Sequence, residues 1–393
     1  MGETAMNNEI SKTMLALIRS AICGSPLSDE ERALYSAEML SEIVKSAREH
    51  DLLHLLSLGL KNNNLLDTGA QQLETEIFKA AYRYEQLKFE LGRLYDTLEK
   101  AEIPYIPLKG AVIRGYYPEA WMRTSCDIDI LVDEGSLERA VALLTEELGY
   151  STDNKKSVHD ISLYSPGGVH LELHYNIMED NETLDRVLSR VWEYASPISE
   201  GKSRHILTNE FFLFHVVAHL AYHFLFGGCG VRPLIDLYLL REKLEYDKEK
   251  LSQLLGEAAL ADFYANLCAL SDAWMLGREH TDITLKMQEY ILDGGVYGSQ
   301  ENRTVIQQQK KGGKFKYFMY RVFLPYDKLK YRYPIIKKHP WLTPFMQVRR
   351  WFAIIFGGRL GRSVSELKVN SSVSRSEAED IRRFLDETGL KNL

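Results

Sequence analysis

The segment RTSCDIDILV, residues 123–132, carries the pattern on which the fold prediction depends. Its isoleucines, leucine and valine are typical of a buried strand, yet Asp127 and Asp129 interrupt it. Successive strand residues point to opposite faces of a sheet, so the two aspartates share one face, and Ile128 and Ile130 share the other. Two neighbouring carboxylates raise each other's pKa unless a cation lies between them. The segment therefore predicts a strand that presents two acids to a ligand.

A second segment, VHLELHYNI at residues 169–177, is predicted to supply a third carboxylate. In a strand, its valine and leucines take one face, while His170, Glu172 and His174 take the other. Pro-Gly-Gly separates it from DISLYS at 160–165, which predicts a β-hairpin. An acid within an apolar strand is costly unless it is paired or bound to metal. If the two acidic strands are neighbours, their carboxylates suit one or two Mg²⁺ ions, with Mn²⁺ as the alternative.

The turn that ends YIPLKG, residues 105–110, is a candidate phosphate site. This short strand runs through Lys109 and Gly110 into the predicted helix AVIRGYY, and backbone N–H groups at a helix start attract anions. The ammonium group of Lys109 adds a positive charge. Arg123, four residues before the first aspartate, is expected to reach the same phosphates. We therefore expect Lys109, Gly110 and Arg123 to bind a nucleotide.

Together, PLKGAVIRGYY, RTSCDIDILV and VHLELHYN resemble the DNA polymerase β-type nucleotidyltransferase superfamily. That superfamily pairs a glycine turn with two aspartates on one strand and a third carboxylate on a nearby strand. The matching residues here are Gly110, Asp127, Asp129 and Glu172. The resemblance implies that the three acids hold Mg²⁺ and catalyse nucleotide transfer from an NTP, with ATP favoured, to an acceptor hydroxyl, releasing pyrophosphate. The acceptor, whether small molecule, protein or RNA, stays open.

Two features depart from the usual superfamily pattern. The turn has Lys-Gly followed by Ala111 where Gly-Ser is usual, and the gap from the turn to the aspartates is longer. Both features resemble a bacterial group described as uncharacterised nucleotidyltransferases, and the resemblance runs from about residue 85 to 360. Two rival hypotheses remain open. One is a DxD-type glycosyltransferase that uses a sugar nucleotide, and the other is a non-catalytic nucleotide-binding or toxin–antitoxin-like protein.

Histidines recur every four residues in the predicted apolar helix that begins TNEFFLFHVV, at His215, His219 and His223. Three histidines on one face can hold zinc, but such a site also needs a fourth ligand. We therefore expect His215 and His219, together with His174 and Asp236, to line the catalytic cleft. Asp236 lies one turn into its own predicted helix, where it serves either the helix dipole or the orientation of a histidine.

Helical periodicity dominates on both sides of this α/β segment. Apolar residues recur at three-to-four spacing over 9–100 and again after the hairpin. The predicted fold is therefore α+β, a small mixed-sheet nucleotidyltransferase core flanked by helical N-terminal and C-terminal parts. The expected regions are a helical N-terminal region (1–88), the α/β core (89–200), a helical domain packing on the active site (201–300) and a basic, aromatic-rich helical C-terminal region (301–393).

Charge is unevenly distributed along the chain, whose formal net charge is −7. Residues 303–362, called here the basic region, contain 15 lysines and arginines and one acid, Asp327, so this region carries +14 and the remainder about −21. Aromatic residues are interspersed among these charges. The composition suits an anionic partner, either nucleic acid or a membrane surface. It also suits an internal brace against the acidic body, which we favour.

The four cysteines, Cys23, Cys126, Cys229 and Cys268, lie far apart and form no CxxC pair, which predicts neither a zinc site nor a disulfide framework. The N-terminal sequence lacks the apolar core of a signal peptide. The longest apolar runs, such as WFAIIFGG at 351–358, fall far short of the ~20 residues that span a membrane. We therefore expect a cytoplasmic protein without a membrane span.

Overall fold

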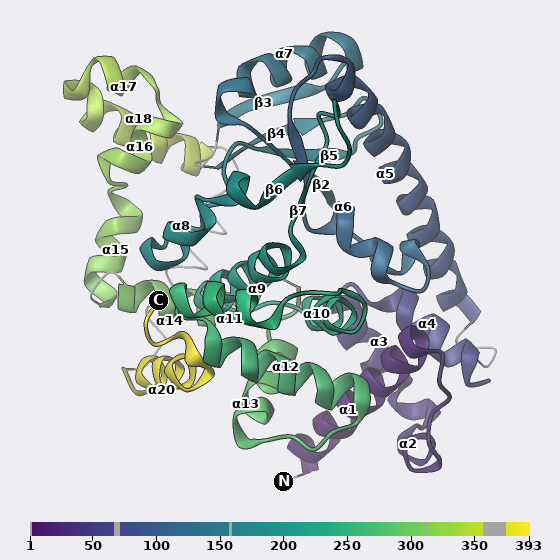
Figure 1. The fold of residues 1–393 in the computed structure, drawn as a ribbon. Coiled ribbons are helices and arrows are strands. Elements are labelled where there is room, and N and C mark those ends of the chain that lie inside the picture. The colour runs from purple at the N-terminus through teal and green to yellow at the C-terminus, as the bar shows by residue number, and fades with distance from the viewer. Residues whose placement is uncertain (1, 67–70, 157–158, 297, 311–312, 357–374) are drawn as a thin grey trace.

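The computed structural model describes residues 2–393 apart from 67–70, 157–158, 297, 311–312 and 357–374. A five-stranded mixed sheet lies in the middle of a mostly helical chain (Figure 1). This arrangement confirms the predicted α+β class. The strands of the sheet are β1 (Tyr105–Pro107), β2 (Asp127–Val132), β3 (Ser151–Lys156), β4 (Asp160–Tyr164) and β5 (His170–His174).

Most α-helices come before or after the sheet segment in the sequence, and α6 and α7 lie between its strands. Within the described residues they are α1 (Gly2–Cys23), α2 (Asp29–Leu34), α3 (Leu40–Glu49), α4 (Leu53–Asn62), α5 (Glu74–Lys100), α6 (Gly110–Ile113), α7 (Leu137–Leu148), α8 (Glu182–Leu188), α9 (Asn209–Leu225), α10 (Arg232–Lys243), α11 (Lys248–Glu257), α12 (Ala261–Leu276), α13 (Asp282–Leu292), α14 (Gln300–Lys310), α15 (Lys314–Val322), α16 (Tyr326–Arg332), α17 (Ile335–Lys338), α18 (Thr343–Phe356) and α20 (Arg375–Leu385).

The strands follow the spatial order β1-β2-β5-β4-β3. β2 and β5 are parallel, and the other neighbouring pairs are antiparallel. β4 and β5 form the hairpin that the sequence predicts. In the parallel pair, Asp127 lies beside His170 and Asp129 lies beside Glu172. The register therefore places Glu172 on the strand next to the two aspartates, as expected.

The edge strand β3 is not predicted by the sequence. Its residues, STDNKK, show no apolar alternation. They form a strand because the free edge of β4 offers backbone hydrogen-bonding groups, although the register shifts between Thr152 and Lys156. A separate two-stranded ribbon, β6 (Ala195–Pro197) with β7 (His205–Leu207), is likewise absent from the sequence prediction. Both elements depend on backbone pairing rather than on an apolar pattern.

The apolar face of the sheet forms a core with two helices. Ile128 and Ile130 of β2 and Leu171 of β5 are buried there with residues of α5 and α7, such as Leu94 and Leu144. The alternation of strand side chains therefore sends the acids to the opposite face. On that face the sheet approaches α9 and α10.

Helices from distant parts of the sequence share a second core. Leu17 of α1 and Leu55 of α4 belong to the same buried cluster as Phe214 of α9 and Phe263 of α12. α9 is apolar on almost every side, and Thr208 caps it by accepting a hydrogen bond from the Phe211 N–H. The N-terminal helices are therefore packed into the helical layer that covers the acidic face of the sheet.

α15 to α18 extend along one side of the molecule as an arm (Figure 1). The arm belongs to the basic region 303–362, of which residues 311–312 and 357–362 lie outside the described residues. Lys328 of α16 forms an ion pair with Asp180, with Nζ 3.4 Å from the carboxylate. No helix within the described ranges is both long and apolar enough to cross a membrane.

Gly59 of α4 tests the packing of α1 against α4, and Gly92 of α5 is the control. A Cβ at Gly59 of α4 would lie 2.2 Å from the Leu17 carbonyl oxygen, so Gly59→Ala should lower the free energy of unfolding by about 1–3 kcal/mol or more. At Gly92 of α5 a Cβ would meet nothing within 4 Å, so Gly92→Ala should raise it by about 0.5–1 kcal/mol. Urea unfolding measures both. A Gly59→Ala protein as stable as wild type would contradict this contact.

Candidate active site

The acids of β2 and β5 converge on one face of the sheet. Two groups of residues could each hold a metal ion, because the ligand atoms within each group all lie within 4.8 Å of one another. One group is formed by Asp127, His170 and Glu172, and the other by Asp129, Glu172 and His174. Glu172 belongs to both groups. Carboxylate oxygens and imidazole nitrogens at this spacing can hold a divalent cation. The sequence places His170 on this face, but only the structure adds it to a ligand group.

Asp129 is surrounded by positive charge. His174 Nε2 lies 3.0 Å and Lys109 Nζ lies 3.7 Å from Asp129 Oδ1. Burial opposes ionisation, but Lys109 and the hydrogen bond from His174 outweigh it and hold the pKa of Asp129 well below its ordinary value. Hydrogen bonds to Asp129 and Glu172 likewise outweigh burial and raise the pKa of His174 to about 9. His174 is therefore a protonated donor, and its hydrogen bond lowers the pKa of Glu172.

Asp127 has no comparable partner. Across the described residues, its carboxylate makes no ion pair or hydrogen bond. Burial, followed by the charges of Asp129 and Glu172, raises the pKa of Asp127 above its ordinary value. A cation beside this carboxylate would favour its charged form. The charges of Lys109 and His170 only partly offset this rise, so the carboxylate of Asp127 suits a divalent cation.

The turn between β1 and α6 holds Lys109 in a rare backbone conformation. Its φ is 38° and its ψ is −112°, values that residues with a side chain seldom adopt. Strain of this kind costs on the order of 1–3 kcal/mol and is found mostly at functional sites. Burial opposes the charge of Lys109, but Asp129 outweighs burial and raises the pKa of the ammonium. The strained turn thus delivers a protonated amine to the acidic face.

Arg123 is anchored by an acid from a distant helix. Its Nε and Nη2 lie 3.3 Å and 2.9 Å from the two carboxylate oxygens of Asp236, and the Tyr117 hydroxyl donates to Asp236 at 2.7 Å. Asp236 therefore contacts an arginine rather than a histidine. The remaining nitrogen, Nη1, has only a 3.5 Å contact with the Thr124 carbonyl oxygen. A Cβ on Gly110 would lie 2.6 Å from Nη1, so glycine at this turn lets the arginine approach.

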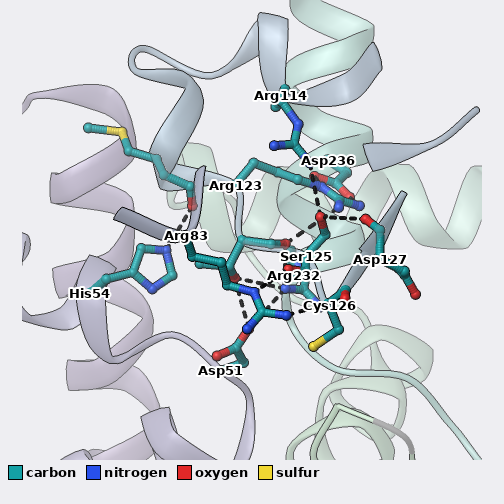
Figure 2. A network of polar contacts seen from close by, with 12 residues as sticks. Asp51, His54, Arg83, Arg114, Arg123, Ser125, Cys126, Asp127, Arg232 and Asp236 are labelled. Carbon is teal, nitrogen blue, oxygen red and sulfur yellow. Dashed lines mark hydrogen bonds and ion pairs between the residues drawn. The ribbon is translucent and has the colours of Figure 1, made fainter. Parts of the chain in front are cut away.

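The loop that joins Arg123 to β2 is held by side chains of three helices (Figure 2). His54 of α4, Arg83 of α5 and Arg232 of α10 all contact its backbone carbonyl oxygens. The pairs are His54 Nε2 with Met122 (2.8 Å), Arg83 with Ser125 (2.8 Å) and Cys126 (3.2 Å), and Arg232 with Thr124 (2.7 Å). Because these four carbonyl oxygens all accept hydrogen bonds from helical side chains, the helices fix the position of the loop. No local sequence pattern indicates these contacts.

The histidines of α9 lie behind the acids. His219 Nδ1 is 2.7 Å from Glu179, a residue without a predicted role, and His223 Nε2 is 2.9 Å from His219 Nε2. Burial lowers the pKa of both His215 and His223 to about 3, so both rings are neutral. Within the described parts of the chain, none of the three belongs to a potential metal-ligand group. The geometry therefore gives the zinc alternative no support.

A cavity of about 300 Å³ lies between the sheet and the helices α9 and α10. Most of the predicted site residues line it, namely Lys109, Gly110, Arg123, Asp127, Asp129, Glu172, His219 and Asp236. His174 and His215 instead line a second cavity of about 100 Å³, which shares Lys109, Glu172 and His219 with the first. The ten predicted residues are thus distributed over two adjacent cavities, with the strained lysine between them.

The buried histidines make stability depend on pH. A histidine whose pKa is lowered by folding binds fewer protons in the folded chain than in the unfolded chain. Its contribution to the free energy of unfolding is therefore intact above about pH 6.5 and is lost as the pH falls. His215→Leu should reduce the loss of unfolding free energy between about pH 7 and about pH 5 by about 2 kcal/mol. Urea unfolding at both pH values measures this. His339→Leu, at an exposed histidine, should retain the full loss; equal losses for the two variants would contradict the assignment.

One comparison with known proteins identifies the family. The chain matches the family model described as uncharacterised nucleotidyltransferase over residues 36–276. The match covers more than half of the chain and includes the sheet, the Lys109 turn, α9 and α10. Searches among curated proteins and among solved structures gave no match. The motifs around the acidic face predicted this group, and the chain belongs to the uncharacterised nucleotidyltransferase family.

Proposed function

We propose that the protein is a metal-dependent nucleotidyltransferase that moves a nucleotide from an NTP, with ATP favoured, onto an acceptor hydroxyl. The observation that carries this proposal is the strand register that sets Asp129 beside Glu172, next to Asp127, whose pKa is raised. These acids line one cavity with Lys109 and Arg123. Acids and fixed cations around one cavity match the needs of a triphosphate that must be bound and cleaved.

The acidic face has the donor set of a hard divalent cation, Mg²⁺ or Mn²⁺. Asp127, Asp129 and Glu172 would hold it, because they supply oxygen ligands and because nearby charges only partly offset the raised pKa of Asp127. Such a cation, when bound, neutralises charge on the phosphoryl group that is transferred. The remaining roles fall to the protein's own groups.

Lys109 and Arg123 are the cations placed to bind the triphosphate. Lys109 Nζ lies 3.7 Å from Asp129 and Arg123 Nη1 lies beside Gly110, and both residues line the cavity, so they can neutralise the phosphates that leave as pyrophosphate. In the transfer, the acceptor oxygen forms a bond to the α-phosphorus as the bond to pyrophosphate breaks. Glu172 accepts the proton of the acceptor hydroxyl. Alignment and charge neutralisation supply most of the acceleration.

The acceptor belongs to one of three classes with a free hydroxyl: a small molecule, a protein or an RNA. The four cysteines are free thiols, which supports the cytoplasmic location expected from the sequence. An NTP is abundant there. The experiments below therefore use ATP and the other NTPs with a cell extract as the source of acceptor.

Asp127→Asn should abolish nucleotide transfer without unfolding the protein. Wild type, incubated with Mg²⁺ and ATP labelled at the α-phosphate, should release pyrophosphate and label an acceptor in the extract. The variant should do neither, and its melting temperature without metal should equal or exceed that of wild type, because one of two repelling charges is gone.

Glu146→Gln is the matched control for the acid-to-amide change. Glu146 is exposed on α7 and lies outside both cavities, so this variant should keep wild-type transfer. Transfer that persists in Asp127→Asn would overturn the proposal. Release of a nucleoside diphosphate from a sugar nucleotide would favour the glycosyltransferase instead. Binding of NTPs without transfer to any acceptor would favour the non-catalytic alternative.

Tyr117→Phe should weaken ATP binding by loosening the anchor of Arg123. The change removes one hydrogen bond to Asp236, so the KM for ATP should rise about fivefold while kcat changes less. Asp236→Asn should act in the same direction and more strongly. Steady-state kinetics at varied ATP concentration measure the split between KM and kcat.

A second buried ion pair separates positioning from general stability. Asp272 pairs with Arg241 at 2.8 Å on helices α12 and α10, outside the lining of either cavity. Asp272→Asn should lower the melting temperature and leave the KM for ATP unchanged. If Tyr117→Phe and Asp272→Asn affect KM equally, Arg123 does not bind the nucleotide through this anchor.

A further inference from the structure

α18 is oriented with polar side chains toward the protein. Gln347 and Arg350 are only 8% and 7% exposed. Arg350 donates to the carbonyl oxygens of Val322 (3.0 Å) and Arg321 (2.6 Å), and Gln347 donates to that of Leu324. The buried side of this helix therefore satisfies backbone carbonyls at the end of α15 and in the loop after it. The half-buried ring of Trp351 packs edge-on against Phe323 on this side.

The opposite side of α18, with the turn before it, is apolar and exposed. Six large side chains spaced three or four residues apart, or adjacent at the end, are between 43% and 79% exposed, and we call them the apolar stripe: Trp341, Phe345, Val348, Phe352, Ile355 and Phe356. In a helix that only braces the protein, such side chains turn inward, because removing apolar area from water is favourable. The reversed orientation indicates that the apolar stripe meets a partner.

Positive charge surrounds the apolar stripe. Arg349 follows Phe345 by four residues on the same helical surface, and Lys337 and Lys338 lie one turn before Trp341. All three basic side chains are exposed. From residue 326 to 356 there are seven lysines and arginines and one acid. The partner must therefore combine an apolar interior with an anionic surface.

We propose that α16, α17 and α18 of the arm bind the surface of an anionic lipid bilayer. The apolar stripe enters the boundary between headgroups and acyl chains, while Lys337, Lys338 and Arg349 contact anionic headgroups. With 14 residues, α18 is about 21 Å long, shorter than the hydrocarbon core of about 30 Å, so it lies along the surface.

Two other partners fit the arm less well. Nucleic acid would engage the aromatic rings by stacking, but Val348 and Ile355 offer no ring to a base. A second copy of this chain would bring together two arms of the same positive charge, which repel. A bilayer alone takes both the aliphatic side chains and the charge. The proposal does not depend on the nucleotide site, which lies in the cavity between the sheet and α9.

The test is flotation of the full chain with lipid vesicles. We expect wild type to float with phosphatidylcholine vesicles that contain phosphatidylserine, and not with phosphatidylcholine alone. Phe345→Glu with Phe352→Glu should lower the partition coefficient by roughly a hundredfold. The matched control is Phe78→Glu with Phe89→Glu on α5, where the two rings are 74% and 64% exposed. The control should float as wild type does.

A charge variant separates the two contributions. Lys337→Glu with Lys338→Glu should abolish flotation at physiological salt, because it replaces two positive charges beside the apolar stripe with negative ones. Circular dichroism of the variant checks that its fold is retained. Phe345→Ser with Phe352→Ser provides a milder change should the glutamate variant fail to fold.

Four results would overturn the proposal. The first is wild type that does not float with anionic vesicles, and the second is an α5 control that loses flotation to the same extent as the arm variant. Steeply salt-dependent RNA binding, in a protein that does not float, would assign the arm to nucleic acid. A dimer seen by analytical ultracentrifugation, and dissociated by the Phe345 and Phe352 changes, would assign the apolar stripe to a second copy.

Discussion

Parallel pairing of β2 with β5 is the interaction on which the site depends. It sets Asp129 beside Glu172 and Asp127 beside His170, and it does so through backbone hydrogen bonds alone. A shift of one residue would turn Glu172 to the apolar face, because strand side chains alternate. The core under α5 and α7 opposes such a shift, since it would expose Leu171 to the acids and bury Glu172 among aliphatic side chains. The same alternation therefore builds the core and orients the acids.

The balance of charge on the acidic face follows from this register. Lys109 and His174 both approach Asp129, so one aspartate is compensated by the protein itself. Asp127 has no comparable ion pair within the described residues, and its pKa is raised. Asp236 anchors Arg123, which lines the same cavity as the acids. The site therefore combines a lysine among the acids with an arginine held by a separate acid.

The helical parts of the chain hold the loop of the site in place and carry the exposed apolar stripe. Helices α4, α5 and α10 hold the loop before β2 by its carbonyl oxygens, so residues far apart in sequence fix the position of the first aspartate. α9 and α18 are both helices with large apolar side chains, yet they are used in opposite ways. α9 is buried on almost every side, whereas α18 turns Gln347 and Arg350 inward and its apolar stripe outward. The contrast assigns α9 to the core and α18 to a surface.

The sequence by itself determined the features that follow from strand and helix periodicity. Alternation in two short segments was sufficient to predict the shared face of Asp127 and Asp129, the hairpin that carries Glu172 and the α+β class. Periodicity is a local property, so it could not show that Asp236 pairs with Arg123, which lies 113 residues earlier in the chain, or that Glu179 meets His219. The polar strand β3 and the carbonyl contacts of the loop likewise have no local signal, since they form by backbone pairing with distant partners. For the basic region the sequence predicted helices, and only the tertiary structure decided which side of α18 faces the protein, because carbonyl oxygens at the end of α15 accept hydrogen bonds from its polar side.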